Sequence, residues 1–422
     1  MNAYKRIAAL GLLLAACVAC TSESVPHTSA SGVASTGPWS ASAAPGSGLP
    51  TPDPPSATLI LPAEFAPALS YVSPDGRFVA ARARDYGRVV LFRITPSSPR
   101  ASTLQLTTVA EVRGYADQVS WLEDSTGVLV GTDLDGRTLS NHDPTRAGRR
   151  VVMLDTDGRV VIAPATAHEV LYHRAAASPD GRWIPVSDRC CVQQMLLLSR
   201  DGTEVRRVAG PAQPADKTLA FVGWDREGLF LYWETSADRS DLVAADLDGT
   251  ERYRIAAPSG YPAVHLGLVA SAPDRSWQLV ELSGGMTSSF RAYRLLVGRD
   301  LLPPPEGLRE SRYGPFVSGD ELVYADSSGM VRAYQPRTDA VRGIPLRLDV
   351  SRGPSTLGIS DGYFVWMELV TGYVGDLTTG RKAVLPLQKI LNASNVEGAR
   401  LAEYHFDDNA IVIFNLATIA KK

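Results

Sequence analysis

The chain is poor in the side chains and segments that mark several large protein classes. Its 422 residues include only 6 histidines, so a histidine-rich metal site is not expected. Basic residues (42) do not outnumber acidic ones (45), which leaves no positive excess for nucleic acid. The apolar run at residues 7–16 is too short for a bilayer, which takes about 20 residues. With 45% apolar and 21% charged residues, the chain is neither disordered nor a polytopic membrane protein.

Motifs of three common enzyme classes give no support for a reaction. The G-x-S-x-G pattern occurs once, at residues 358–362, where Ser360-Asp361-Gly362 is one of the turns of the repeat described below rather than the nucleophile elbow of a hydrolase. No lysine follows a glycine, as the phosphate-binding P-loop requires, and no G-x-G-x-x-G opens a helix. The sequence therefore points to no particular reaction.

The N-terminus has the pattern of a secretory signal. Lys5 and Arg6 precede the short apolar run, which ends in Leu14-Ala15-Ala16-Cys17. An ordinary signal peptide with an incidental cysteine is the alternative. Cys20 is a weaker candidate for a special role, because Cys17 would occupy the third position before it.

This ending resembles the lipobox of bacterial lipoproteins. The resemblance implies cleavage after the signal peptide (1–16), diacylation of Cys17, and attachment to the cell membrane on its extracytoplasmic side. That side is the outer face in a Gram-positive bacterium and the periplasm in a Gram-negative one. Residues 17–56 are rich in Ser, Ala, Pro and Gly, as expected of a disordered tether, whose reach is roughly 30–40 Å. Because the remaining chain is mildly acidic, the lipid rather than its charge would hold it on the membrane.

A repeat occupies the rest of the chain, and its 36 glycines and 29 prolines predict many turns. The segment Ser73-Pro74-Asp75-Gly76-Arg77 recurs as 178–182, and an apolar strand follows each copy. The spacing of the turn aspartates averages about 47 residues, which fits one four-stranded sheet per repeat. Degenerate copies complete a series of eight turns: Asp75, Asp124, Asp180, Asp225, Asp274, Asp320, Asp361 and Asp407.

A second set of Asp-Gly turns lies later in several repeats, at 155–158, 199–202 and 246–249. These turns predict hairpins between the third and fourth strands. The aspartate pairs 155/157 and 246/248 resemble calcium loops, but the other ligands of such loops are missing. Hairpins are therefore favoured, Ca²⁺ has no support, and no cofactor is expected.

The Ser-Pro-Asp-Gly pattern resembles the TolB-like and WD40-like β-propeller repeats. The resemblance covers residues 64–417 and implies an all-β fold, a propeller domain over 57–422 that is expected to be monomeric. We expect eight four-stranded repeats with a composite last blade, in which residues 57–61 join the C-terminal hairpin as closing strand. Seven blades are the alternative. A tether stands here in place of the N-terminal α/β domain of TolB, so no Tol-type role is implied.

Acidic residues recur where the second strand of a repeat ends. If these strands run alike, the carboxylates form a ring on the ligand face of the propeller and could bind a cation or a basic partner. Solvation of strand ends is the alternative. The candidate binding residues are Asp85, Asp133, Asp188, Arg189, Glu234, Glu281, Asp326 and Glu368.

The adjacent Cys190 and Cys191 lie in a loop on the same face. Outside the cytoplasm they could close a strained vicinal disulfide; two free thiols are the alternative. Aromatic residues of the strands are expected in the core between sheets rather than in a ligand cage. They are Phe230, Tyr232, Trp233, Phe364 and Trp366.

Two classes of function remain. The first is a membrane-anchored module that binds a protein, peptide or envelope glycan on its loop-rich face, since propellers offer a rigid ring with variable loops. The alternative is a propeller enzyme of the lactonase, cyclase or lyase kind, with an acidic or metal site at the channel mouth. No catalytic residue can be named from the sequence.

Overall fold

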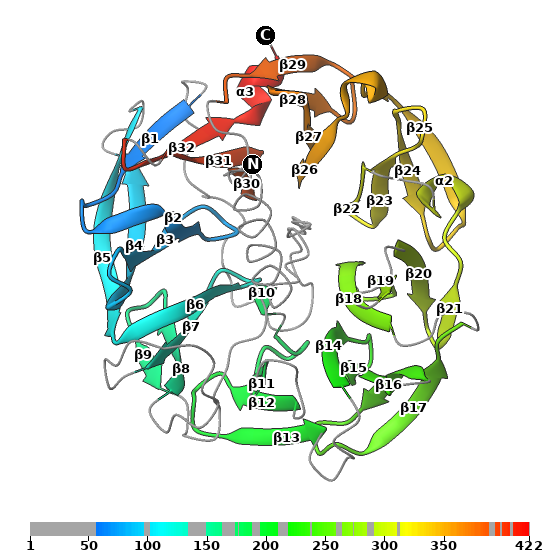
Figure 1. Cartoon of the computed structure of the whole chain (residues 1–422), viewed down its shortest axis with the longest axis horizontal. Helices are drawn as coiled ribbons and strands as arrows, with labels where there is room; N and C mark the ends of the chain where they lie inside the picture. The colour runs from blue at the N-terminus through cyan, green and yellow to red at the C-terminus, as the bar shows by residue number, and fades with distance from the viewer. Residues whose placement is uncertain are drawn as a thin grey trace, which may run out of the picture.

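The structure, a computed structural model, is a ring of β-sheets arranged around a central axis (Figure 1). It describes residues 56–96, 102–133, 149–162, 174–175, 177–187, 195–209, 218–236, 239–258, 264–272, 274–284, 291–309, 313–387, 393–396, 399–405 and 408–421. The predicted signal segment and nearly all of the predicted tether lie outside these residues. Among the described helices, none has the length and apolar character needed to span a membrane.

Four sheets each consist of four consecutive antiparallel strands. The first two are β14 (Thr218–Trp224), β15 (Phe230–Thr235), β16 (Ser240–Ala245) and β17 (Glu251–Ala256), then β18 (Val264–Ser271), β19 (Trp277–Gly284), β20 (Arg291–Val297) and β21 (Asp300–Leu302). The others are β22 (Tyr313–Ser318), β23 (Glu321–Ala325), β24 (Met330–Gln335) and β25 (Ala340–Arg347), then β26 (Ser355–Ser360), β27 (Tyr363–Glu368), β28 (Thr371–Asp376) and β29 (Lys382–Leu385).

The N-terminal part of the ring contains a three-stranded and a five-stranded sheet. The three-stranded sheet is β11 (Trp183–Ser187), β12 (Met195–Ser199) and β13 (Val205–Ala209). The five-stranded sheet is β6 (Tyr115–Leu122), β7 (Gly127–Asp133), β8 (Arg149–Asp155) and β9 (Val160–Ile162), with β10 (Arg174–Ala175) parallel to β6.

A single eight-stranded sheet spans the point where the ring closes. It comprises β2 (Phe65–Val72), β3 (Phe78–Ala83), β4 (Arg88–Pro96), β5 (Thr103–Arg113), β1 (Ser56–Ile60), β32 (Ala410–Asn415), β31 (Arg400–His405) and β30 (Ala393–Val396). Three short helical segments complete the described chain: α2 (Glu306–Arg309), the 3-10 turn η1 (Val350–Arg352) and α3 (Leu416–Ala420).

The middle strands of the sheets are apolar along their whole length because they are covered on both faces. Every residue of β3 and of β16 is buried, whereas the outer strand β17 is partly or fully exposed throughout. Neighbouring sheets pack face to face through large side chains, as where Trp183 of β11 meets Phe221 and Phe230. Radial packing therefore gives each sheet the cover that a lone four-stranded sheet lacks.

The expected aromatic core is present. Phe230 and Tyr232 pack between β15 and the sheet before it, and Trp233 faces the sheet after it. Phe364 and Trp366 are fully buried against β23 and β25. The prediction that these aromatic side chains form core between sheets is confirmed.

The ring is closed by the N-terminal strand, as predicted. All five residues of β1 pair antiparallel with β32, so that Ser56 lies opposite Phe414 and Ile60 opposite Ala410. Strand β1 also pairs parallel with β5 through Thr58 and Leu59, a contact that the sequence did not suggest. The closing strand is therefore hydrogen-bonded on both sides, and no free edge remains at this seam.

The last repeat is in a different register from the one expected. Asp407, the predicted turn residue, lies outside the described residues, but in the chain it falls between β31 and β32. These are the second and third strands counted from β30, whereas the first and second were expected on either side of it. The true first turn lies between β30 and β31 and has no Ser-Pro-Asp-Gly sequence. The error arose because Asp407 precedes an apolar strand in the same way as the true turn aspartates do.

The ring has two different rims. Here "turn rim" means the side that carries the turns between first and second and between third and fourth strands. Hydrogen bonds place these turns together: the Asp75 amide donates to Ser125 Oγ (3.0 Å), and Thr156 N donates to Thr126 O (3.0 Å). "Loop rim" means the opposite side, with the links from second to third strands and the connections between sheets. There, Ala116 N donates to Tyr86 O (2.8 Å). The chain is thus an all-β propeller with several four-stranded blades.

Candidate functional site on the loop rim

The turn rim uses its polar groups to hold itself together. In the first turn, Ser73 Oγ donates to Asp75 Oδ1 (2.6 Å) and accepts from Phe78 N (3.0 Å). The turn of Ser199 repeats this arrangement with Asp201 (2.6 Å), and the hydrogen bonds from Ser199 and Thr203 lower the pKa of Asp201 to about 2. Gly76 has a φ of 71°, which glycine adopts without strain. These aspartates and serines already have partners, so they serve the fold.

The glycine position of these turns is not always glycine. Like Ser125, Arg275 occupies this position with a φ of 58°. Its Nη2 donates to Ala177 O (3.3 Å), two sheets earlier in the ring. Burial lowers the pKa of Arg275, while Glu123 and Asp225 counteract that shift. Arg275 therefore links several sheets on this side at the cost of a strained backbone.

The predicted strand-end carboxylates do lie on the loop rim where the structure describes them. Asp85 is exposed in the β3–β4 hairpin, and Glu281 is partly buried in β19. Glu234, Asp326 and Glu368 are buried. Asp133 is the last residue of β7, and Asp188 and Arg189 lie outside the described residues, as do Cys17, Cys190 and Cys191.

Glu368 is bonded to three separate segments of the chain. Its Oε1 accepts hydrogen bonds from Trp366 Nε1 (3.0 Å), Asp349 N (3.0 Å) and Lys382 Nζ (3.0 Å). The same ammonium lies 3.9 Å from the ring centroid of Tyr373, a cation–π distance. Burial would raise the pKa of Glu368, but these three donors hold it below its ordinary value. The group fastens β27, β29 and the connection before β26 to one another.

Glu234 belongs to a second network, built on different partners. Arg254 Nη1 of the outer strand β17 contacts Glu234 Oε1 and Asp241 Oδ2, both at 2.9 Å. Arg254 Nη2 also binds Glu251 Oε2 (2.7 Å), and Arg239 Nε binds Asp241 Oδ2 (2.8 Å). The hydrogen bonds that Arg254 donates, above all the one to Glu251, raise the pKa of Arg254 above its usual range. Three acids and two arginines thus compensate one another within a single sheet.

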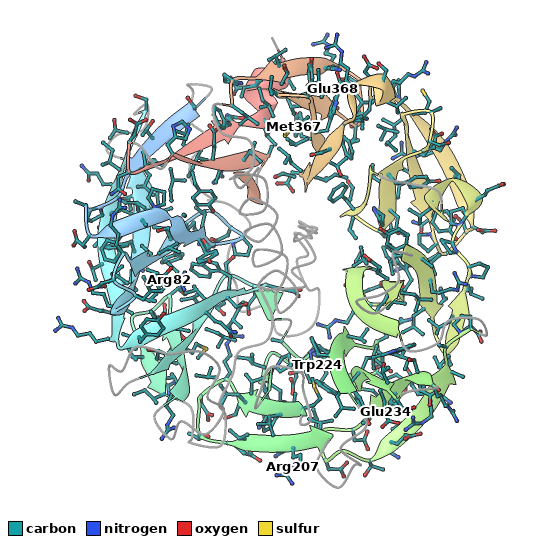
Figure 2. The ribbon with its side chains drawn as sticks, in the orientation of Figure 1. Arg82, Arg207, Trp224, Glu234, Met367 and Glu368 are labelled. Atoms are coloured by element: carbon teal, nitrogen blue, oxygen red, sulfur yellow. The ribbon has the colours of Figure 1, made fainter. Side chains whose placement is uncertain are left out.

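The carboxylates do not converge on one point. Glu234 and Glu368 lie on distant parts of the ring, and neither is at its centre (Figure 2). Asp326 is held inside its own hairpin by Ser328 (2.6 Å) and Arg332 (2.5 Å). Burial would raise the pKa of Asp326, but these bonds lower it overall. Within the described part of the chain, no three His, Cys, Asp or Glu residues stand close enough to hold a metal ion.

Other loop-rim polar residues were missed by the sequence analysis. Arg82, near the end of β3, is buried: its Nη1 donates to Ala116 O (3.3 Å) and its guanidinium lies 4.4 Å from the Tyr86 ring (Figure 2). Tyr86 stacks in turn on Tyr115 at 5.6 Å, joining two sheets. A charged residue within the apolar run around Arg82 is the signal in the sequence that could have found it.

The closing sheet carries a similar feature. Glu403 and His405 of β31 are buried, with Oε2 and Nε2 2.6 Å apart, and Asp408 lies 3.8 Å from Nδ1. The wrong register of the last repeat hid this pair, because β31 was not recognised as a second strand. The polar residues near the loop-rim ends of second strands thus include both signs of charge, and their partners differ from sheet to sheet.

No protein-family model matches the sequence, and no curated protein matches it either. Solved structures resemble it in fold only. The C-terminal WD40 domain of Sif2 has 13% identity and a TM-score of 0.49, covering 85% of this chain and 99% of that domain. The β-propeller domain of Cps50 (Swd1) from Myceliophteria thermophila has 13% identity and a TM-score of 0.40, covering 84% and 97%. BamB from Moraxella catarrhalis has 12% identity and a TM-score of 0.41, covering 85% and 96%. The propeller assignment rests on the strand pairing of this chain.

Proposed function

We propose that the protein is a membrane-anchored, extracytoplasmic binding module that holds a protein, peptide or envelope glycan on its loop rim. The observation that carries this proposal is the difference between the rims. On the turn rim, aspartates and serines are bonded within repeated turns. On the loop rim, the side chains differ from sheet to sheet and stand on a rigid ring, the usual arrangement of a binding face.

We infer an eight-bladed ring for this module. The eight blades would begin with the strands β2, β6, β10, β14, β18, β22, β26 and β30. In this interpretation β10 is the first strand of the blade formed with β11–β13, although it is hydrogen-bonded to β6. The last blade is β30, β31, β32 and β1, in which the N-terminal strand supplies the fourth member. Eight blades would give the loop rim eight separate hairpins.

The anchor is proposed at Cys17, on the lipobox pattern of residues 14–17. An acyl anchor needs two or more chains for stable attachment, which diacylation would supply. In the bacterial host, Cys17→Ser should move the protein from the membrane fraction to the soluble fraction and abolish labelling with radioactive palmitate. Cys20→Ser is the matched control and should change neither. Equal labelling of both variants would refute the assignment of Cys17.

Binding is tested by crosslinking the anchored, full-length protein in cells. Charge reversal on a binding rim slows association, so Asp85→Lys should lower the yield of a discrete crosslinked adduct severalfold. Asp157→Lys is the matched control, because Asp157 is an exposed aspartate in the β8–β9 turn of the opposite rim. An adduct that Asp157→Lys weakens and Asp85→Lys leaves intact would overturn the assignment of the loop rim.

A further inference from the structure

The hairpin between β27 and β28 carries the most exposed apolar residues of the described chain. Glu368 pairs with Thr371, so Leu369 and Val370 alone form the turn. Their exposed fractions are 67% and 82%. Among the large hydrophobic residues described, the next most exposed is Ile60 at 64%, at the loop-rim end of β1 in the closing sheet. The strand pairing puts all three on the loop rim. The closing sheet that contains β1 lies next to the sheet of β27 and β28 in the ring (Figure 1).

The residues Leu369 and Val370 do not favour the backbone conformation of this hairpin turn. Leu369 has a φ of 58°, whereas two-residue hairpins normally place glycine or asparagine at such a position. The β23–β24 hairpin of this rim has Gly329 at its positive φ of 83°. Tyr86 of the β3–β4 hairpin also has a positive φ, 62°, but its ring is held by stacking on Tyr115 and by the Arg82 guanidinium. An exposed leucine in a left-handed conformation gains no burial to offset its strain. The folded chain alone does not explain the Leu-Val pair.

The base of this hairpin is rigid and its surroundings are apolar and basic. Glu368, directly before the tip, holds Trp366 and Lys382 and the backbone amide of Asp349. The last of these bonds brings the connection after β25 beside the tip. That connection carries the exposed Val350, and it lies between the exposed Arg347 and Arg352. Because Arg352 Nε pairs with Asp349 Oδ2 (3.1 Å), the net positive charge of this connection is that of Arg347.

From these contacts we propose that the Leu369–Val370 tip docks into the bilayer surface, with Arg347 and Arg352 beside the anionic headgroups. This inference rests on the proposed anchor at Cys17, which keeps a bilayer within reach. Ser56 lies at the turn-rim end of β1, so the tether must pass the height of one strand, about 20 Å for six residues. A tether of the predicted length reaches roughly 30–40 Å. A weak apolar contact is sufficient because tethering gives the tip a high effective concentration at the membrane.

This docking would turn the loop rim toward the membrane, so that its ligand lies in or at the membrane surface. A bilayer fits the observations better than a glycan does, because aliphatic tips offer a glycan neither hydrogen bonds nor an aromatic face. It also fits the pairing of an apolar tip with basic neighbours. A protein with an apolar socket would be a different occupant, and the test below separates the two.

The test uses the acylated full-length protein in vesicles of phosphatidylcholine and phosphatidylglycerol that contain doxyl-labelled quencher lipids. An environment-sensitive fluorescent amino acid replaces Val370 in one sample and Asp157, on the turn rim, in another. We expect the fluorophore at 370 to be blue-shifted and quenched, more strongly with phosphatidylglycerol than without it, and the fluorophore at 157 to be unaffected. Equal, unquenched emission at both positions from vesicle-bound protein would overturn the docking proposal. A blue shift at 370 without quenching, seen only after an envelope protein is added, would overturn it in favour of a protein socket.

A second variant keeps the test independent of folding and of the anchor. Leu369→Gly with Val370→Ser places glycine at the one turn position that has a positive φ and removes the apolar tip. With the fluorophore at Val350 instead, quenching should be present in the native background and lost in this variant. Failure of the protein to float with the vesicles would refute the anchor alone. In that event a C-terminal histidine tag on a nickel-chelating lipid holds the same protein at the surface, and the readout at 370 still decides the docking proposal.

Discussion

The two rims of the ring use polar side chains in different ways. On the turn rim, the same Ser–Asp arrangement appears in separate repeats, and the bonds span a few residues of sequence. On the loop rim, Glu368 and Glu234 are buried and reach a lysine or an arginine on the outer strand, each through its own geometry. The repeated local bonds hold the turns of every repeat in the same conformation. The long-range pairs differ from blade to blade, so each blade can present a different surface. The following substitutions test this comparison, from the largest expected effect to the smallest.

The loop-rim network of Glu368 should contribute most to stability. Glu368→Ala leaves Lys382, the Trp366 indole and the Asp349 amide without their acceptor, and we expect a loss of about 2–4 kcal/mol. Glu64→Ala is the matched control, because the Glu64–Arg88 pair (3.0 Å) is exposed and should cost less than about 1 kcal/mol. Urea unfolding measures both, and equal losses would contradict the account.

On the turn rim, two turns with the same hydrogen bonds should differ in their contribution to stability, because one is buried and the other is at the surface. Ser73 is fully buried, so Ser73→Ala should cost about 1–3 kcal/mol by leaving Asp75 and the Phe78 amide without their partner. Ser199 makes the equivalent bonds at the surface, where water can replace them, so Ser199→Ala should cost less than about 1 kcal/mol. Urea unfolding of the two variants decides the point. A larger loss for Ser199→Ala would show that burial does not set the strength of these turns.

Substitutions of Arg275 separate the cost of its backbone strain from the contribution of its hydrogen bond to Ala177. Arg275→Ala removes the bond to Ala177 but keeps a side chain at a φ of 58°, whereas Arg275→Gly removes both. The glycine variant should therefore be more stable than the alanine variant by about 1 kcal/mol. Thermal unfolding compares them, and identical midpoints would mean that the backbone at this turn relaxes without strain.

The smallest expected effect is on how the stability of the fold depends on pH below about 5. The bonds that Asp326 accepts lower its pKa, so it favours the folded state above the unfolded pKa of about 4. That stability is lost as the pH falls from about 4 through the lower folded pKa. Asp326→Asn should therefore flatten the fall in urea midpoint between pH 5 and pH 3.

The matched turn-rim variant is Asp201→Asn. The pKa of Asp201 is lowered to about 2, but this carboxylate is fully exposed and its bonds compete with water. Its replacement should change the pH profile less than Asp326→Asn does. A larger change for Asp201→Asn would reverse the expected order of the rims.

The turns and the ring closure could be predicted because their causes are local. Asp75 accepts bonds from residues next to it, and residues 57–61 were recognised as an apolar strand without a partner. The same local logic misplaced Asp407, since a turn that precedes an apolar strand has one signature in either register.

The loop-rim partners could not be predicted, because they are set by the order of strands in space. Glu234 meets Arg254, and Glu368 meets Lys382, two strands away in each sheet, and no spacing in the sequence marks such a pair. The sequence could therefore predict that the carboxylates lie on one rim. It could not predict that each carboxylate has its own partners within its blade.

The most direct test of the difference between the rims is site-specific photo-crosslinking of the full-length protein in living cells. A photoreactive amino acid at Asp85 on the loop rim is compared with the same residue at Asp157 on the turn rim, both exposed hairpin positions. The account predicts a discrete adduct with an envelope component from position 85 and none from position 157. An adduct from position 157 with none from position 85 would contradict it.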